Sequence, residues 1–68
     1  SNGMVWEDKA YLKVYRDSFD LNIRSAGANI QGYIVLPNED IKTIKTNSTA
    51  KITLPIIDSS YIFMLINL

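Results

Sequence analysis

The chain has 68 residues with no cysteine and no histidine, and its seven Lys and Arg residues balance seven Asp and Glu residues. This composition excludes disulfides, cysteine nucleophiles and the common zinc sites, and it lacks the basic excess of most duplex-DNA and anionic-membrane binders. A chain this short buries only about 60% of the surface that its unfolded form exposes, so self-association is the remaining source of extra stability. We expect one domain at residues 4–68, with residues 1–3, ahead of Met4, as a cloning remnant.

The sequence contains no candidate for a membrane segment. Its longest apolar run, Tyr61–Ile66, is far shorter than the roughly 20 residues that a spanning helix needs, and no signal-peptide pattern opens the chain. We therefore predict a cytoplasmic protein that does not interact with a membrane.

The N-terminal segment, residues 6–17, has two possible periodicities. Trp6, Ala10 and Val14 recur every four residues, and Asp8 is a possible cap, which predicts an amphipathic N-terminal α-helix. Ala10, Leu12 and Val14 also alternate with polar neighbours, as in a half-buried strand. We favour the helix and keep the strand as the alternative.

The next segments indicate β structure. Apolar and polar residues alternate over 19–24, which predicts a strand, and residues 24–29 form a turn in which Gly27 can adopt a positive φ. A second strand is expected at Ile30–Leu36. Gly32 inside it marks a bulge or sharp bend near another strand, which would let this strand serve two sheets of a small barrel.

The C-terminal half continues in short elements. Pro37 ends the second strand because it cannot donate a ladder hydrogen bond, and a polar loop follows it. Residues 41–46 are either a third strand or one helical turn. A final pair of strands is expected at Lys51–Ile57 and Tyr61–Leu68.

This final pair carries apolar side chains on both faces. Such strands are normally covered on both sides, and a small barrel has too little protein to cover them alone. We therefore predict a homo-oligomer in which the segments 51–57 and 61–68 of neighbouring copies pair. The alternative is that one face of these strands packs under the predicted N-terminal helix.

Three segments carry a family resemblance. Glu7–Ala10 stands where the family has a Gln-Asp-Lys-Ala-like helix start, Gly27–Ile34 is similar to a Gly-x-x-Leu-Gln-Gly-x-Ile strand, and Asn38 falls at a family Asp. In these segments and in its order of elements the chain resembles the Sm-like fold, specifically the bacterial Hfq branch. The resemblance implies a mainly β fold: a small Sm-like (SH3-like) five-stranded antiparallel barrel with an N-terminal α-helix, assembled into a hexameric ring.

The chain also departs from that family. The family's Tyr-Lys-His-Ala-Ile-Ser signature, which supplies a uridine-binding Lys-His pair, is absent, and this region is Leu54–Ser59. Asp40 stands at the family's base-stacking aromatic residue, and Glu39 at its companion Gln. Two carboxylates at the rim of an RNA pocket would repel phosphate.

The resemblance implies binding of single-stranded RNA, repeated around a ring. The amides of Gln31 and Asn29 can hydrogen-bond to base edges, and Lys9, Lys13 and Arg16 would form a basic stripe on the predicted helix. The expected RNA-binding residues are Gln31, Asn29, Ile30, Gly27, Arg16, Asn38 and Asp8.

Catalysis is not expected, because the chain has no His or Cys and its adjacent Glu39 and Asp40 are typical of a solvated loop. We predict no enzyme activity, cofactor or metal. The alternative function is a small β-barrel oligomeric protein-interaction module that does not bind RNA, which the missing Lys-His pair and the zero net charge favour.

Overall fold

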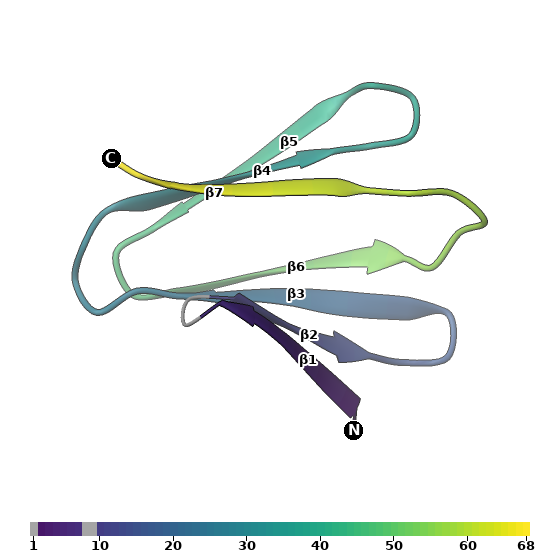
Figure 1. The fold of residues 1–68 in the computed structure, drawn as a ribbon, viewed down its shortest axis with the longest axis horizontal. Helices are drawn as coiled ribbons and strands as arrows, with labels where there is room; N and C mark the ends of the chain where they lie inside the picture. The colour runs from purple at the N-terminus through teal and green to yellow at the C-terminus, as the bar shows by residue number, and fades with distance from the viewer. Residues whose placement is uncertain (1, 8–9) are drawn as a thin grey trace.

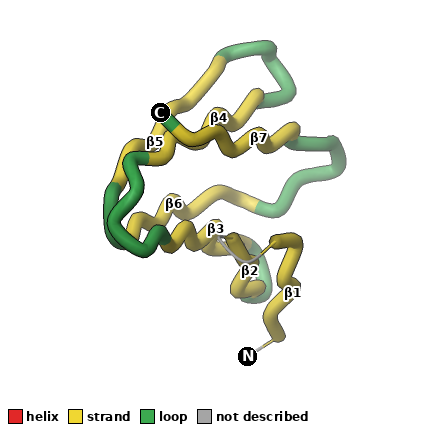
Figure 2. The backbone as a smooth tube through the Cα atoms, turned by 60° about the vertical axis from the view of Figure 1, so that its left-hand side comes forward, coloured by secondary structure: helices red, strands yellow, loops and turns green. Residues whose placement is uncertain are grey.

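The computed structural model describes the backbone of residues 2–7 and 10–68 and the side chains of residues 10–68. The chain folds into two antiparallel sheets that form two layers (Figures 1 and 2). Sheet A has the strand order β1-β2-β3-β6 and sheet B has the order β5-β4-β7. The strands are β1 (Asn2–Glu7), β2 (Ala10–Val14), β3 (Ser18–Arg24), β4 (Ile30–Val35), β5 (Ile41–Thr46), β6 (Thr49–Pro55) and β7 (Ile62–Asn67).

The core lies between the two layers. Alternate side chains of β3 and β4 point inward, because successive residues of a strand face opposite sides of its sheet. The inward positions hold the buried apolar residues Ala10, Leu21, Ile23, Ile30, Ile34 and Leu54. The outward positions of each sheet are therefore the surfaces available to partners.

Two connections at one end of the molecule hold the sheets together. The loop between β3 and β4 runs from sheet A to sheet B, and the short turn between β5 and β6 returns the chain to sheet A (Figure 1). The backbone N–H of Ser25 donates to the carbonyl of Ser48 at 2.6 Å, and that of Gly27 to the carbonyl of Asn47 at 3.1 Å. Gly27 has a φ of 93°, which confirms the predicted turn.

The predicted N-terminal helix is wrong for the described residues. The strand alternative holds for β2, where Ala10 is buried, Leu12 is half-buried and Tyr11 is exposed. β2 pairs with β3 on one side and with β1 on the other. Alternation therefore outweighs the four-residue spacing, because the face of β2 that carries Ala10 and Leu12 packs toward the core. Asp8 and Lys9 lie outside the described residues.

The predicted closed barrel is also wrong. Among the described strands, β6 pairs with β3 and β7 pairs with β4, and no pairing joins the two sheets. β4 belongs to sheet B alone and keeps an even register with both of its neighbours, so Gly32 marks no bulge. The predicted close approach at Gly32 is confirmed, since a Cβ there would lie 3.0 Å from the Cδ1 of Ile23 in sheet A.

Of the two C-terminal strands, only β7 has the predicted apolar side chains on both faces. The prediction is wrong for β6, because Lys51 and Thr53 occupy its outward positions and make that face polar. Residues 41–46 form the strand β5 and no helical turn, and β4 ends before Pro37. In β7, Ile62 and Met64 are exposed while Phe63 packs against the core, so both faces are apolar as predicted. β6 and β7 each lie at the margin of their own sheet, and their pairing between copies stays a prediction.

Candidate nucleic-acid interface

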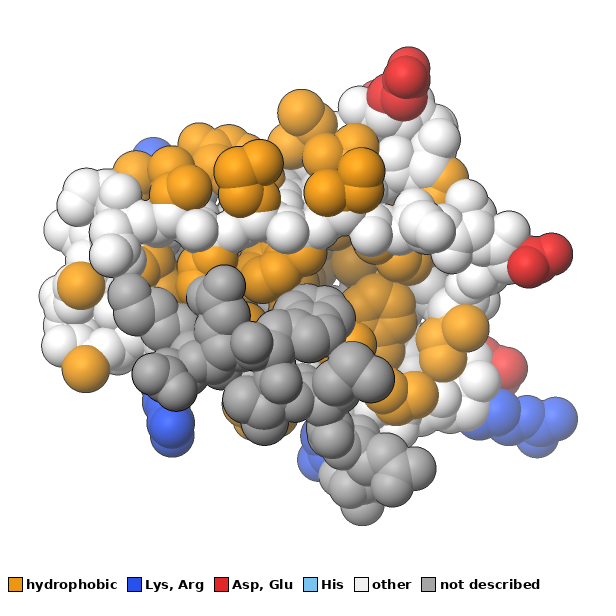
Figure 3. Space-filling view, in the orientation of Figure 1, with side chains coloured by type: hydrophobic (Ala, Val, Ile, Leu, Met, Phe, Trp, Pro, Cys, Tyr) orange, Lys and Arg blue, Asp and Glu red, His pale blue; other side chains and the backbone are white. Residues whose placement is uncertain are grey.

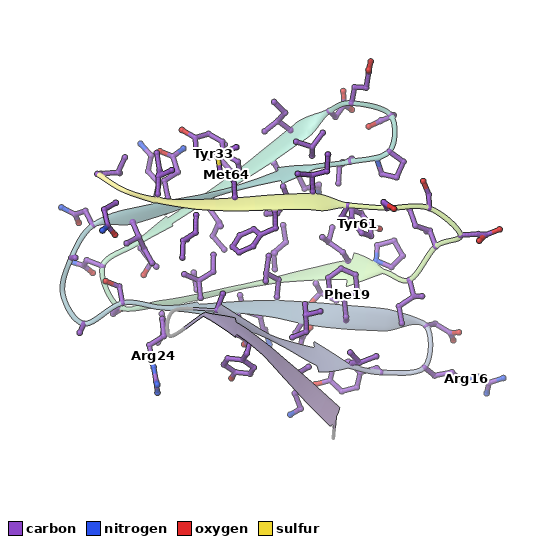
Figure 4. The ribbon with its side chains drawn as sticks, viewed as in Figure 1. Arg16, Phe19, Arg24, Tyr33, Tyr61 and Met64 are labelled. Carbon is purple, nitrogen blue, oxygen red and sulfur yellow. The ribbon has the colours of Figure 1, made fainter. Side chains whose placement is uncertain are left out.

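The residues predicted to bind RNA do not converge on one surface. Arg16 lies in the turn between β2 and β3, whereas Gly27 and Asn29 lie in the loop at the other end of β3. Figure 4 shows this separation, with Arg16 at one end of the molecule and Arg24, which ends β3, near the other. Gln31 is on the outer face of sheet B.

Three of the predicted residues have structural roles of their own. The side chain of Ile30 is 1% exposed and belongs to the core. Asn38 forms a local turn, in which its amide donates to Oδ2 of Asp40 at 2.9 Å and its Oδ1 accepts the backbone N–H of Asp40 at 3.0 Å. The N–H of Gly27 is occupied by Asn47. Asp8 lies outside the described residues.

Sheet A instead brings aromatic, amide and cationic side chains together on its outer face. Tyr11, Asn22 and Lys51 stand directly opposite one another on β2, β3 and β6. Because neighbouring strands are about 4.8 Å apart, this row spans about 10 Å. Tyr11 is 43% exposed, and Lys51 is also exposed.

The row borders a hollow in the protein surface. The hollow has a volume of about 460 Å³, and Tyr11, Asn22, Arg24, Thr49 and Lys51 are among its lining residues. Arg24 is paired with Thr49 at one end of the hollow, which places a second cation beside the row. The surface thus combines an aromatic ring, an amide and two cations.

The next row along sheet A contains a carboxylate, that of Asp20. Lys13, Asp20 and Thr53 are opposite one another on β2, β3 and β6. The hydroxyl of Thr53 donates to Oδ1 of Asp20 at 2.6 Å, and the hydroxyl of Tyr15 donates to Oδ2 at 3.3 Å. These bonds give the carboxylate fixed partners within the sheet.

The Thr53 hydrogen bond is the main cause of a lowered pKa of Asp20. The positive charge of Lys51, the Tyr15 hydroxyl and the charge of Lys13 lower this pKa further, while burial opposes them. Asp20 is therefore a carboxylate at neutral pH. Among the described side chains, Lys13, Arg24 and Lys51 nevertheless give the outer face of sheet A more positive than negative charge.

Lys13 also contacts an aromatic ring, since its Nζ is 5.8 Å from the ring centroid of Tyr15. The helical spacing predicts Lys13 on a basic stripe with Arg16, whereas the structure places it on a strand face. Strand alternation alone indicates that Asn22 and Arg24 face solvent. The signal missing from the sequence is the register that sets Lys51 of β6 beside them.

The described residues contain no cluster of three or more His, Cys, Asp or Glu that could hold a metal ion. They also contain no helix with the length and hydrophobicity to cross a membrane. Comparison of the chain with family models, curated proteins and solved structures found no match. The Sm-like resemblance stays a prediction.

Proposed function

We propose that this protein binds single-stranded RNA on the outer face of sheet A. The observation that carries the proposal is the row Tyr11, Asn22 and Lys51 with Arg24 beside it. Proteins that hold single strands combine aromatic faces for stacking with cations for phosphate, and amides read base edges. Here all three groups occur within about 10 Å on a firmly paired sheet.

Each residue has a distinct part in this binding mode. The exposed ring of Tyr11 stacks on a base, and the amide of Asn22 hydrogen-bonds to its edge. Lys51 and Arg24 neutralise the phosphates that flank this base. Asn22 is held in place by its own donation to the backbone carbonyl of Asp20 at 3.3 Å. The proposed activity is binding alone, and no covalent bond is made or broken. The cytoplasmic location of the protein stays a prediction.

Fluorescence anisotropy with labelled oligo-A and oligo-U tests the proposal over a range of salt concentrations. Lys51→Ala and Arg24→Ala should each weaken binding and lower the salt slope, by about 0.7 for each single-strand phosphate that the variant no longer neutralises. Tyr11→Ala should cost about 1–3 kcal/mol because the base then has no ring to stack on.

Lys42→Ala is the matched control, because Lys42 is an exposed lysine on β5 of the other sheet. It should leave affinity and salt slope close to those of the unmodified protein. If neither oligo-A nor oligo-U binds at low salt, the proposal is contradicted. A loss of affinity in Lys42→Ala equal to that in Lys51→Ala would also contradict it.

A second candidate function is that of a protein-interaction module that does not bind RNA. The observation that favours it is the set of large apolar side chains left exposed on sheet B, including Ile41, Ile62 and Met64. Absorbance at two wavelengths separates the two functions in freshly purified native protein. A nucleic-acid signal that Lys51→Ala lowers supports RNA binding, and a protein companion without nucleic acid supports the second function.

A further inference from the structure

The outer face of sheet B is an apolar surface on the side of the molecule opposite the proposed RNA-binding face. Three of its rows cross all three strands, and two of them are mostly apolar: the first is Ile41, Val35 and Ile62, and the second is Thr43, Tyr33 and Met64. Figure 4 shows Tyr33 and Met64 close together on this side, and Figure 3 shows hydrophobic side chains gathered over β7. A third row contains Lys45, Gln31 and Ile66.

These apolar side chains are unusually exposed for a strand face. Ile41 is 60% exposed, Ile62 is 62% exposed and Met64 is 55% exposed. Three strands of this length cover about 300 Å² in plan, so a face-to-face contact covers about 600 Å² over the two copies. This lies below the roughly 1,000 Å² of stable specific interfaces. The area therefore suits a weak, reversible dimer.

The charges around this face are arranged at its two ends. Lys45 lies on the outer face at one end of β5, in the row of Gln31. Glu39 and Asp40 lie in the turn that precedes the other end of β5, and both are exposed. The face thus carries positive charge at one end and negative charge at the other.

This polarity selects one way of packing two copies. A two-fold axis in the plane of the sheet and perpendicular to the strands places β5 over β5 in opposite directions. Lys45 of each copy then meets the Glu39 and Asp40 turn of the other, so the charge contact is made twice. An axis parallel to the strands would stack β5 on β7 and leave these charges without opposite partners.

We propose that the protein forms a two-fold symmetric dimer in which the outer faces of two B sheets pack against each other. Met64, Ile62 and Tyr33 form the apolar centre, and the charge contacts of Lys45 with Glu39 and Asp40 fix the orientation. The contact leaves the outer face of sheet A open in both copies. It rests on sheet B alone and holds whether or not sheet A binds RNA.

Sedimentation equilibrium over a wide range of protein concentration tests this dimer. The mass should rise from monomer toward dimer as the protein concentration increases. Met64→Glu should weaken association at least tenfold, because it places a charge at the centre of the contact. Ile57→Glu is the matched control: Ile57 is an exposed apolar residue between β6 and β7, off this face, and its variant should still dimerise.

A charge exchange tests the orientation separately from the apolar contact. Lys45→Glu and Glu39→Lys should each weaken the dimer roughly tenfold, since each creates two repulsive contacts in the symmetric pair. The double variant should recover most of the affinity. Circular dichroism of every variant checks that the monomer remains folded.

A stable monomer at every concentration would overturn the proposal. Dimerisation that Met64→Glu does not change would overturn it by placing the contact elsewhere. An additive loss in the charge-exchanged double variant would overturn the proposed orientation. RNA binding measured on the same variants is a separate readout, and it should persist in Met64→Glu.

Discussion

Gly32 shows how a single residue sets the distance between the two layers. A Cβ at this position would lie 3.0 Å from Ile23 Cδ1, 3.0 Å from Ile44 Cγ2 and 3.1 Å from Phe63 Cε1. Those three side chains come from β3, β5 and β7, so the glycine lets both sheets approach at one point. Its role is close packing, because β4 is regular on both sides.

Gly32→Ala should lower the free energy of unfolding by about 1–3 kcal/mol through overpacking. Ile23→Val removes the Cδ1 methyl that the new Cβ would meet, and alone it should cost about 0.5–1.5 kcal/mol. The double variant should therefore be more stable than the sum of the two single effects predicts. Urea unfolding measures all three.

Gly27→Ala is the control for that experiment. Nothing lies within 4 Å of a Cβ at this position, but its φ of +93° is strained for a residue with a side chain. Ile23→Val should leave the cost of Gly27→Ala unchanged. Strict additivity of Gly32→Ala with Ile23→Val would show that the layers adjust freely and would contradict the packing argument.

Asp20 gives the protein a specific acid sensitivity. The Thr53 hydrogen bond lowers its pKa below the ordinary value of 3.8 in the folded state. Its contribution to stability is therefore complete above that value and is lost as the pH falls through the folded pKa. Urea unfolding from neutral pH down to about pH 3 should show a steeper loss of stability for the unmodified protein than for Asp20→Asn.

Thr53→Val should reduce this acid dependence as well, since it removes the strongest cause of the shift. Asp58→Asn, in the loop between β6 and β7, removes one negative charge without touching this site and serves as the control. If the stability of the unmodified protein and of Asp20→Asn depends on pH in the same way, Asp20 is not the source of the acid sensitivity.

Among the secondary-structure elements, β6 and the start of β7 are linked by the side chain of Tyr61. Tyr61, just before β7, packs edge-on against Phe19 of β3 with 5.6 Å between ring centroids and 70° between ring planes. Its hydroxyl donates to the carbonyl of Pro55 at the end of β6, at 2.7 Å. Tyr61 thus contacts Phe19, an inward residue of sheet A, and also the end of β6. Among the described residues, no backbone hydrogen-bond ladder joins β6 to β7.

A double-mutant cycle measures this link. Phe19→Leu and Tyr61→Leu should each destabilise the fold, and their coupling should be about 0.5–1.5 kcal/mol for the edge-on ring pair. Tyr61→Phe keeps the ring and removes the hydroxyl, so it should cost about 0.5–1.5 kcal/mol for the hydrogen bond alone. A coupling near zero between Phe19→Leu and Tyr61→Leu would show that the two sheets are held together elsewhere.

The free energy of local opening should differ between the central strands and the strands at the margins of the sheets. β3 lies between β2 and β6, and β4 lies between β5 and β7, so both have hydrogen-bonded neighbours on two sides. β5 lies at the margin of sheet B, and most of its side chains are exposed. Local opening should therefore begin at β5 and reach β3 and β4 last.

Native-state hydrogen exchange tests this order. Amides of β3 and β4 should exchange most slowly, at rates near those of global unfolding, and amides of β5 should exchange faster than those of β4. The experiment should use Met64→Glu or a low protein concentration, so that the proposed dimer does not protect sheet B. Protection of β5 equal to that of β4 would contradict the expected order.

Local periodicity predicted much of the fold from residue 19 onward. Alternation identified the solvent-facing side of β3, Pro37 marked the end of β4, and Gly27 marked the turn between the sheets. This works because strand side chains alternate for steric reasons that lie within the strand. The same alternation was present at Ala10 and Leu12, where a competing helical spacing led to the wrong prediction.

The placement of strands against one another came from the tertiary structure. Tyr11, Asn22 and Lys51 are far apart in the chain, and only the pairing of β2 with β3 and of β3 with β6 sets them in one row. The division into two sheets has the same origin, as do the apolar rows of sheet B. Pairing depends on which distant segments bury the most apolar surface together, and the period within one strand carries no information about that choice.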